Sequence, residues 1–145
     1  MDYFSKGLPD HVNDAIKNKY YVEAFLCLHM FLESDLIGCI IEKTYTIGNP
    51  TIIDDKEERT YPIKEDEWNK FDFKTAARVC LFMDIINEIF FQRLNEFNST
   101  RNKLAHQLLK KDIDEKYLKK IIDDGIKIYF DLGDILLKIQ QNKIT

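Results

Sequence analysis

The feature that most constrains this chain is the spacing of its apolar residues between about residues 20 and 43. They recur at every third or fourth position, which is the repeat of one helix face rather than of a β-strand. The members of this stripe are Val22, Phe25, Leu26, His29, Leu32, Leu36, Ile37 and Ile40. The pattern predicts a long helix from Tyr20-Tyr21 to near Lys43, and other elements must cover its apolar face.

The same stretch is too interrupted to be predicted as a membrane span. A membrane-spanning helix needs about 18 or more apolar residues with few charges. Here residues 25–41 are very apolar but contain His29, Glu33, Ser34 and Asp35. No basic segment followed by an apolar one opens the chain, so no secretory signal is visible. We expect a core helix of a soluble, cytoplasmic protein that has no membrane partner.

Further periodic segments predict an all-α fold, an up-and-down bundle of about five helices. A short first helix is expected from Pro9 or Asp10 to about Lys19. Helical spacing resumes at about Phe73 and is expected to break near Asp84, which with Glu88 nearby is a candidate cap for the next helix.

The last helix is expected to begin with a capping box of Asp112 and Glu115 and to run to about Gln141. Its inner stripe comprises Leu118, Ile121, Ile122, Gly125, Tyr129, Leu132, Leu136 and Ile139. Gly125 and Gly133 lie eight positions apart, and each costs about 1 kcal/mol relative to Ala inside a helix. They either allow close approach of another helix or are merely tolerated.

Residues 44–70 do not continue the helical pattern. Tyr45, Ile47, Ile52 and Ile53 alternate loosely around Gly48-Asn49-Pro50, which is typical of a turn, and the acidic run Asp54 to Glu58 follows. We expect a long connection or a small β-hairpin inserted into one domain that spans residues 1–145. Such an insertion could cover a cleft or a partner, or simply be mobile, and its acidic run is more often solvated than metal-binding.

The composition excludes several classes of function. With 145 residues, 32% of them charged, and a net charge of −4, the chain is not a general nucleic-acid coat protein. Basic residues outnumber acidic ones between residues 93 and 111, so this segment is either a local anion-binding patch or a solvated helix face. Its basic members are Arg93, Arg101, Lys103, Lys110 and Lys111, against Glu96.

No metal or cofactor site is expected at the cysteines or at the histidine of the first long helix. Cys27, Cys39 and Cys80 are odd in number and widely spaced, which favours buried free thiols in a reducing compartment. His29 lies on an apolar stripe and is expected to be a core histidine hydrogen-bonded to a neighbour, rather than a ligand. No cofactor is expected, since phosphate-loop, serine-hydrolase and zinc-protease motifs are missing.

The stretch Arg101-Asn102-Lys103-Leu104-Ala105-His106 combines an arginine, an amide and a histidine within two helical turns. At about 100° per residue, Asn102 and His106 share one helix face, and Arg101 lies about 140° from His106. Asn98-Ser99-Thr100 before it offers cap residues, so we expect the group to open a helix that ends near Lys110 or Lys111. The free N–H groups of that helix end would then help Arg101 to bind a phosphate.

These residues resemble the signature of HEPN domains, in which four to six residues separate an arginine from a histidine. The segment Tyr-Val-Glu-Ala-Phe, at residues 21–25, is similar to the entry into the first long helix of several HEPN-type proteins. The resemblance implies an all-helical homodimer in which two motifs face one cleft, and a metal-independent endoribonuclease that cuts single-stranded RNA. It implies that Arg101 and His106 act on the scissile phosphate and that Asn102 orients them.

Further expectations follow from this resemblance and from its alternatives. Lys103, Lys110 and Thr100 are the candidates for additional RNA contacts. A nuclease of this family would be a toxin or defence effector, with a neutralising antitoxin or regulatory protein as its partner. The alternatives are a non-catalytic dimerisation or binding module, in which Arg101 and His106 tie helices together, and an unrelated helical bundle.

Overall fold

The computed structural model describes residues 7–47, 50–53, 56–59, 70–110 and 113–141, with side chains described at 7–44, 70–107 and 113–141. This part of the chain is an all-α bundle of five helices with one small hairpin, which confirms the predicted fold class. The elements in order are α1 (Asp10–Lys17), α2 (Tyr21–Ile47), β1 (Pro50–Ile53), β2 (Lys56–Arg59), α4 (Phe73–Phe82), α5 (Glu88–Lys110) and α6 (Glu115–Gln141).

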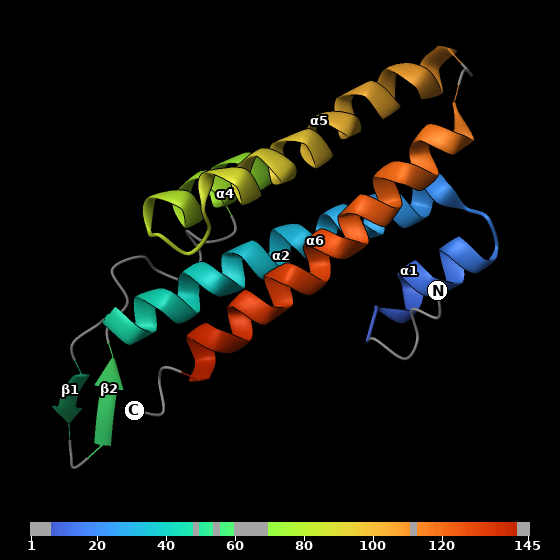
Figure 1. Cartoon of the computed structure of the whole chain (residues 1–145). Coiled ribbons are helices and arrows are strands. Elements are labelled where there is room, and N and C mark those ends of the chain that lie inside the picture. The colour runs from blue at the N-terminus through green and yellow to red at the C-terminus, as the bar shows by residue number, and fades with distance from the viewer. Residues whose placement is uncertain (1–6, 48–49, 54–55, 60–69, 111–112, 142–145) are drawn as a thin grey trace.

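The two longest helices, α2 and α6, form the centre of the bundle (Figure 1). They lie side by side and run in the same direction, whereas α5 runs back in the opposite direction. The short helix α1 packs on the beginning of α2, and α4 packs on both α2 and α5. The hairpin lies beyond the C-terminal end of α2, away from α5.

Helix α2 is apolar along most of its length and buries one face against its neighbours, whereas Leu26 and Met30 on its other face are exposed. Phe25, Leu28, Leu32 and Leu36 are fully buried. By length and composition alone, residues 21–44 could cross a membrane, but 44% of the most apolar part is buried inside the bundle. Burial of this kind is the dominant stabilising contribution in a bundle of this size.

The contact between α5 and α6 depends on a glycine. A Cβ atom added to Gly125 would overlap the ring of Phe97 on α5 and would lie 2.7 Å from Cδ2 of Leu28 on α2. Gly125 therefore allows three helices to meet, which is the first of the two roles considered above. Gly133 has no heavy atom within 4 Å of such a Cβ, so it is merely tolerated.

The predicted caps of two helices are wrong in detail. Asp84 has a left-handed backbone (φ 56°) and ends α4, because its N–H donates to the carbonyl of Leu81. The cap of α5 is Asn87, whose Oδ1 accepts from the backbone N–H of Phe90. The cap of α6 is Asp114, whose Oδ1 accepts from two backbone N–H groups, whereas Asp112 lies outside the described residues.

The insertion contains a hairpin, but not one built around Gly48-Asn49-Pro50. Helix α2 continues to Ile47, and Pro50 already begins strand β1. The strands are antiparallel, with Pro50 opposite Arg59 and Ile53 opposite Lys56. The acidic run is therefore divided, since Lys56 to Glu58 belong to β2, and Asp54 and Asp55 lie outside the described residues.

Candidate functional site

Helix α5 runs without a break through the candidate motif. The prediction that Asn98-Ser99-Thr100 caps a new helix is wrong, since these residues lie in the middle of a helix from Glu88 to Lys110. Arg101 is consequently not at a helix N-terminus, and the backbone N–H groups around it are used within the helix. The expected contribution of free N–H groups and the helix dipole to phosphate binding is therefore absent.

The helix continues because these polar side chains have other partners. The hydroxyl groups of Ser99 and Thr100 both donate to the backbone carbonyl of Glu96, one turn earlier, instead of accepting from N–H groups ahead of them. A buried stripe also continues across the expected break, formed by Phe90, Leu94, Phe97, Thr100 and Leu104. Burial along one face thus overrides the capping preference of the three residues.

The unbroken helix presents most of the candidate site residues to solvent. Arg101, Asn102, Lys103 and His106 are all exposed. Thr100 is only 2% exposed, so its expected role in binding RNA is not retained. The side chain of Lys110 lies outside the described residues.

Arg101 and Asn102 line a cavity of about 250 Å³ between α5 and the start of α4. The other lining residues are Asp72, Phe73, Lys74 and Asn98. His106 is not among them, because it lies five residues further along α5, which corresponds to about 7.5 Å of helix rise. The structure therefore brings Arg101 and Asn102 into one polar cavity and leaves His106 beside it on the same helix.

A buried histidine lies behind this cavity. His29 of α2 is 4% exposed, and its Nε2 is 2.8 Å from Oδ1 of Asn98 on α5. Burial lowers the pKa of His29, and the nearby Arg101 guanidinium lowers it further, although the hydrogen bond to Asn98 opposes this shift. The imidazole ring stacks on Phe73 with a centroid distance of 4.5 Å. His29 is thus the hydrogen-bonded core histidine that we expected.

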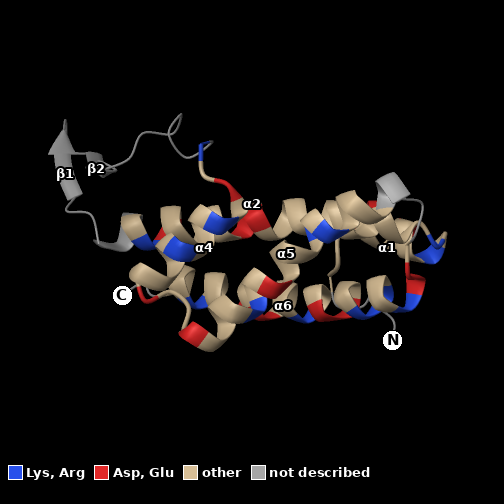
Figure 2. Ribbon diagram, turned by 90° about the horizontal axis from the view of Figure 1, so that it is seen from above, with Lys and Arg blue, Asp and Glu red and all other residues tan. Residues whose placement is uncertain are grey.

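The basic residues of α5 are not equivalent. Arg93 forms an ion pair with Asp131 of α6, with Nη1 and Oδ2 3.0 Å apart, and its guanidinium lies over the ring of Phe90. Its charge is therefore partly neutralised. Acidic and basic residues are interspersed along α6 (Figure 2). Among the described side chains of α5, Arg101 and Lys103 are the exposed basic residues that lie in the motif.

The cysteines and acidic residues provide no metal site in the described part of the chain. Among those residues, no group of three or more His, Cys, Asp or Glu side chains could hold an ion. Cys39 and Cys80 are buried free thiols, and Cys27 is half-buried. Burial raises the pKa of Cys39 to about 12, with a further contribution from Asp35 and Glu42.

Sequence reasoning missed the contribution of Asn98 and Lys74 to the cavity. Asn98 lies three residues before Arg101 and four before Asn102, so the i,i+3 and i,i+4 rule could have placed all three on one face. The cap preference of asparagine predicts a helix start there instead. No sequence signal could have paired Asn98 with His29, which lies 69 residues away.

Comparisons with protein-family models, with curated proteins and with solved structures found no significant match to this chain.

Proposed function

We propose that this protein is a metal-independent endoribonuclease that cuts single-stranded RNA as a homodimer. The observation that supports the proposal is the joint exposure of Arg101, Asn102 and His106 on one unbroken helix, with the first two lining a polar cavity. A guanidinium can bond two phosphate oxygens at once, and histidine ordinarily titrates near neutrality. These are the two groups that RNA transesterification requires when no metal is used.

Helix geometry gives a physical reason for the dimer. Arg101 and His106 lie about 140° apart around α5, so the two groups of one subunit do not converge on one point. An antiparallel crossing of two α5 helices, centred between Lys103 and Leu104, would place Arg101 of one subunit level with His106 of the other. Ala105 is small and exposed, so it would not obstruct this approach. The resulting contact has the two-fold symmetry of most homodimers.

In this mechanism the ribose 2′-hydroxyl is the nucleophile. Its oxygen attacks the adjacent phosphorus while one His106 imidazole accepts its proton. The bond from phosphorus to the 5′-oxygen breaks, and that oxygen takes a proton from the imidazolium of the other His106. Arg101 stabilises the negative charge that develops on the phosphate oxygens, and Asn102 orients the pair. The products are a 2′,3′-cyclic phosphate and a 5′-hydroxyl.

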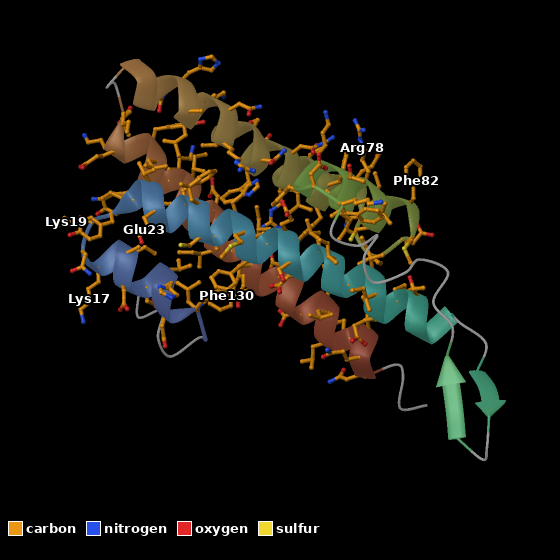
Figure 3. The ribbon with its side chains drawn as sticks, turned by 180° about the vertical axis from the view of Figure 1, so that it is seen from behind. Lys17, Lys19, Glu23, Arg78, Phe82 and Phe130 are labelled. Carbon is orange, nitrogen blue, oxygen red and sulfur yellow. The ribbon has the colours of Figure 1, made fainter. Side chains whose placement is uncertain are left out.

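The experiment is an RNA-cleavage assay with matched alanine variants. His106→Ala and Arg101→Ala should each lower the cleavage rate at least 100-fold, within the range for loss of a general acid–base group or a charge-stabilising group. Their controls are His11→Ala on α1 and Arg78→Ala on α4, which replace exposed residues. Arg78 is labelled in Figure 3. Unchanged cleavage by the His106 variant would refute the mechanism.

A solution-mass measurement tests the dimer separately. Wild-type protein should have the mass of two chains at assay concentrations. If the wild-type protein is monomeric at concentrations at which it cuts RNA, the shared cleft is wrong.

Two observations favour a second candidate, a non-catalytic dimerisation or binding module. Arg101 lacks the helix-end N–H groups expected beside a catalytic phosphate site, and His106 does not line the cavity. In that case the protein would bind RNA or a partner without cutting it. The cleavage assay separates the two candidates, because a module leaves the RNA intact.

A cellular role follows from the proposed activity. Unregulated RNA cleavage harms its host, so a toxin or defence effector with a neutralising antitoxin or regulatory protein fits the proposed nuclease. Under this role, expression of the wild-type protein should arrest growth, whereas expression of the His106→Ala variant should not.

A further inference from the structure

We propose that the cavity between α4 and α5 is the phosphate subsite of the RNA, and that buried His29 positions the Asn98 amide as one of its donors. This inference rests on the proposed function and adds three residues to it. Asn98 and Lys74 would bind the phosphate together with Arg101. His29 would act through Asn98, without touching RNA.

The orientation of the Asn98 amide follows from its contact with His29. The amide oxygen can only accept a hydrogen bond, so Nε2 of His29 must carry the proton and donate it across 2.8 Å. Burial keeps the imidazole neutral by lowering its pKa, and a neutral imidazole has one N–H, which this bond uses. With the oxygen fixed toward His29, the amide NH₂ lies on the other side of the group. Since Asn98 lines the cavity, this NH₂ is a donor for a ligand there.

The ring of His29 is itself held in place. It stacks on Phe73, which also lines the cavity, and the interplanar angle is 24°. Phe97 provides a second ring at a centroid distance of 6.1 Å. A buried, stacked imidazole has few alternative rotamers. Its Nε2–H group is therefore held in position to donate to Asn98.

The charges of the cavity favour an anion. Arg101 and Lys74 contribute two positive charges, and Asp72 contributes one negative charge. The Asp72 carboxylate is engaged at the start of α4, where its Oδ1 accepts from the N–H of Thr75 at 2.7 Å, and this bond lowers the pKa of Asp72. A net positive lining with amide donors from Asn98 and Asn102 matches the oxygens of a phosphodiester.

The size and position of the cavity favour one phosphate of a chain. Its volume of about 250 Å³ is below the roughly 300 Å³ at which cofactor pockets begin. Arg101 is shared between this cavity and the proposed reaction, so the phosphate held here would be the one that is cleaved. A free phosphate ion would make the same contacts, and the experiment must separate these two sources.

The test measures binding without cleavage. The probe is a single-stranded 2′-O-methyl RNA, which lacks the nucleophile, and its dissociation constant is measured by fluorescence anisotropy at fixed low salt. Asn98→Ala and Lys74→Ala should each weaken binding roughly 3- to 10-fold, as expected for loss of one hydrogen bond or one phosphate contact. Lys17→Ala, an exposed lysine on α1 at the opposite end of the bundle from α4, should bind like the wild type (Figure 3).

The role of His29 has its own pair of variants. His29→Phe keeps an aromatic ring for Phe73 but loses the donor, so it should weaken binding as much as Asn98→Ala does. The double variant should show no further loss, since both changes remove the same interaction. His29→Gln restores an N–H donor and should recover affinity, which a purely structural role would not predict. Additive losses in the double variant would refute the positioning role.

Asn98→Asp keeps the oxygen that accepts from His29, and it replaces the NH₂ by a second oxygen. It should bind the probe more weakly than Asn98→Ala while circular dichroism shows the wild-type helix content. This variant tests whether Asn98 faces the bound phosphate even if His29→Phe does not fold.

The outcomes separate the subsite from the nuclease. Weakened binding in the Asn98 and Lys74 variants supports the subsite, even if no RNA is cut. Wild-type affinity in both variants overturns it, even if His106→Ala abolishes cleavage. Binding of inorganic phosphate with the same variant dependence, but no binding of the RNA probe, would identify a free-phosphate site and overturn the RNA assignment.

Discussion

Gly125 of α6 faces the ring of Phe97 of α5 so closely that no side chain fits between them. This contact holds the middle of α5 against the bundle, immediately before the residues that form the candidate site. Leu28 of α2 closes the same space, so the position of α5 depends on two central helices at once. The site is thus attached to a packed core rather than to a loop.

Gly125→Ala should destabilise the protein by about 1–3 kcal/mol, because the added methyl group overpacks a core formed by Phe97 and Leu28. Gly133→Ala is the matched control. Gly133 is exposed on the same helix, so alanine there should stabilise the protein by up to about 1 kcal/mol. Urea denaturation followed by circular dichroism measures both changes. Equal effects of the two substitutions would show that Gly125 is not a packing site.

The stability of the protein should decrease in mild acid through His29. Its pKa in the folded protein lies below the ordinary histidine value of 6.5, because burial disfavours the charged ring. As the pH falls below about 6.5, the unfolded chain binds a proton that the folded chain does not, so unfolding becomes easier. The loss should grow until the pH reaches the folded-state pKa. Urea midpoints between pH 5 and 8 should therefore fall more steeply for the wild type than for His29→Gln, and parallel curves would contradict this account.

The three thiols should differ in reactivity toward iodoacetamide. Cys39 and Cys80 are buried, and burial raises the pKa values of both thiols, so little thiolate is present at neutral pH. Cys27 is half-buried and should be alkylated first, whereas all three should react in denaturant. Mass spectrometry of digested protein assigns the sites. Fast labelling of Cys39 in the folded protein would show that this part of the core opens readily.

The helices could be predicted because periodic apolar residues depend only on local spacing. The predicted end of α6 near Gln141 is confirmed, and α5 ends at Lys110 as expected. The predicted break before Arg101 was wrong because a run of Asn, Ser and Thr can occur either at a helix cap or inside a helix. The buried stripe from Phe90 to Leu104 keeps these residues in the interior of a helix, and Asn98 contacts His29 from there.

The candidate site was predicted only in part. Exposure of Arg101 and His106 is compatible with their expected roles, whereas burial of Thr100 removes one expected RNA contact. The cavity could not be foreseen, because it requires the start of α4 to lie beside the middle of α5. Lys74 and Asp72 come from a segment that local patterns do not connect to the motif.

In the proposed mechanism, Arg101 and His106 act on one phosphodiester without a metal ion. The most direct measurement is the chemistry of the RNA ends that purified wild-type protein and His106→Ala produce in the presence of EDTA. The wild type should produce 2′,3′-cyclic phosphate and 5′-hydroxyl ends, and the variant should leave the RNA intact. Cleavage that requires added metal, or identical ends from both proteins, would contradict this mechanism.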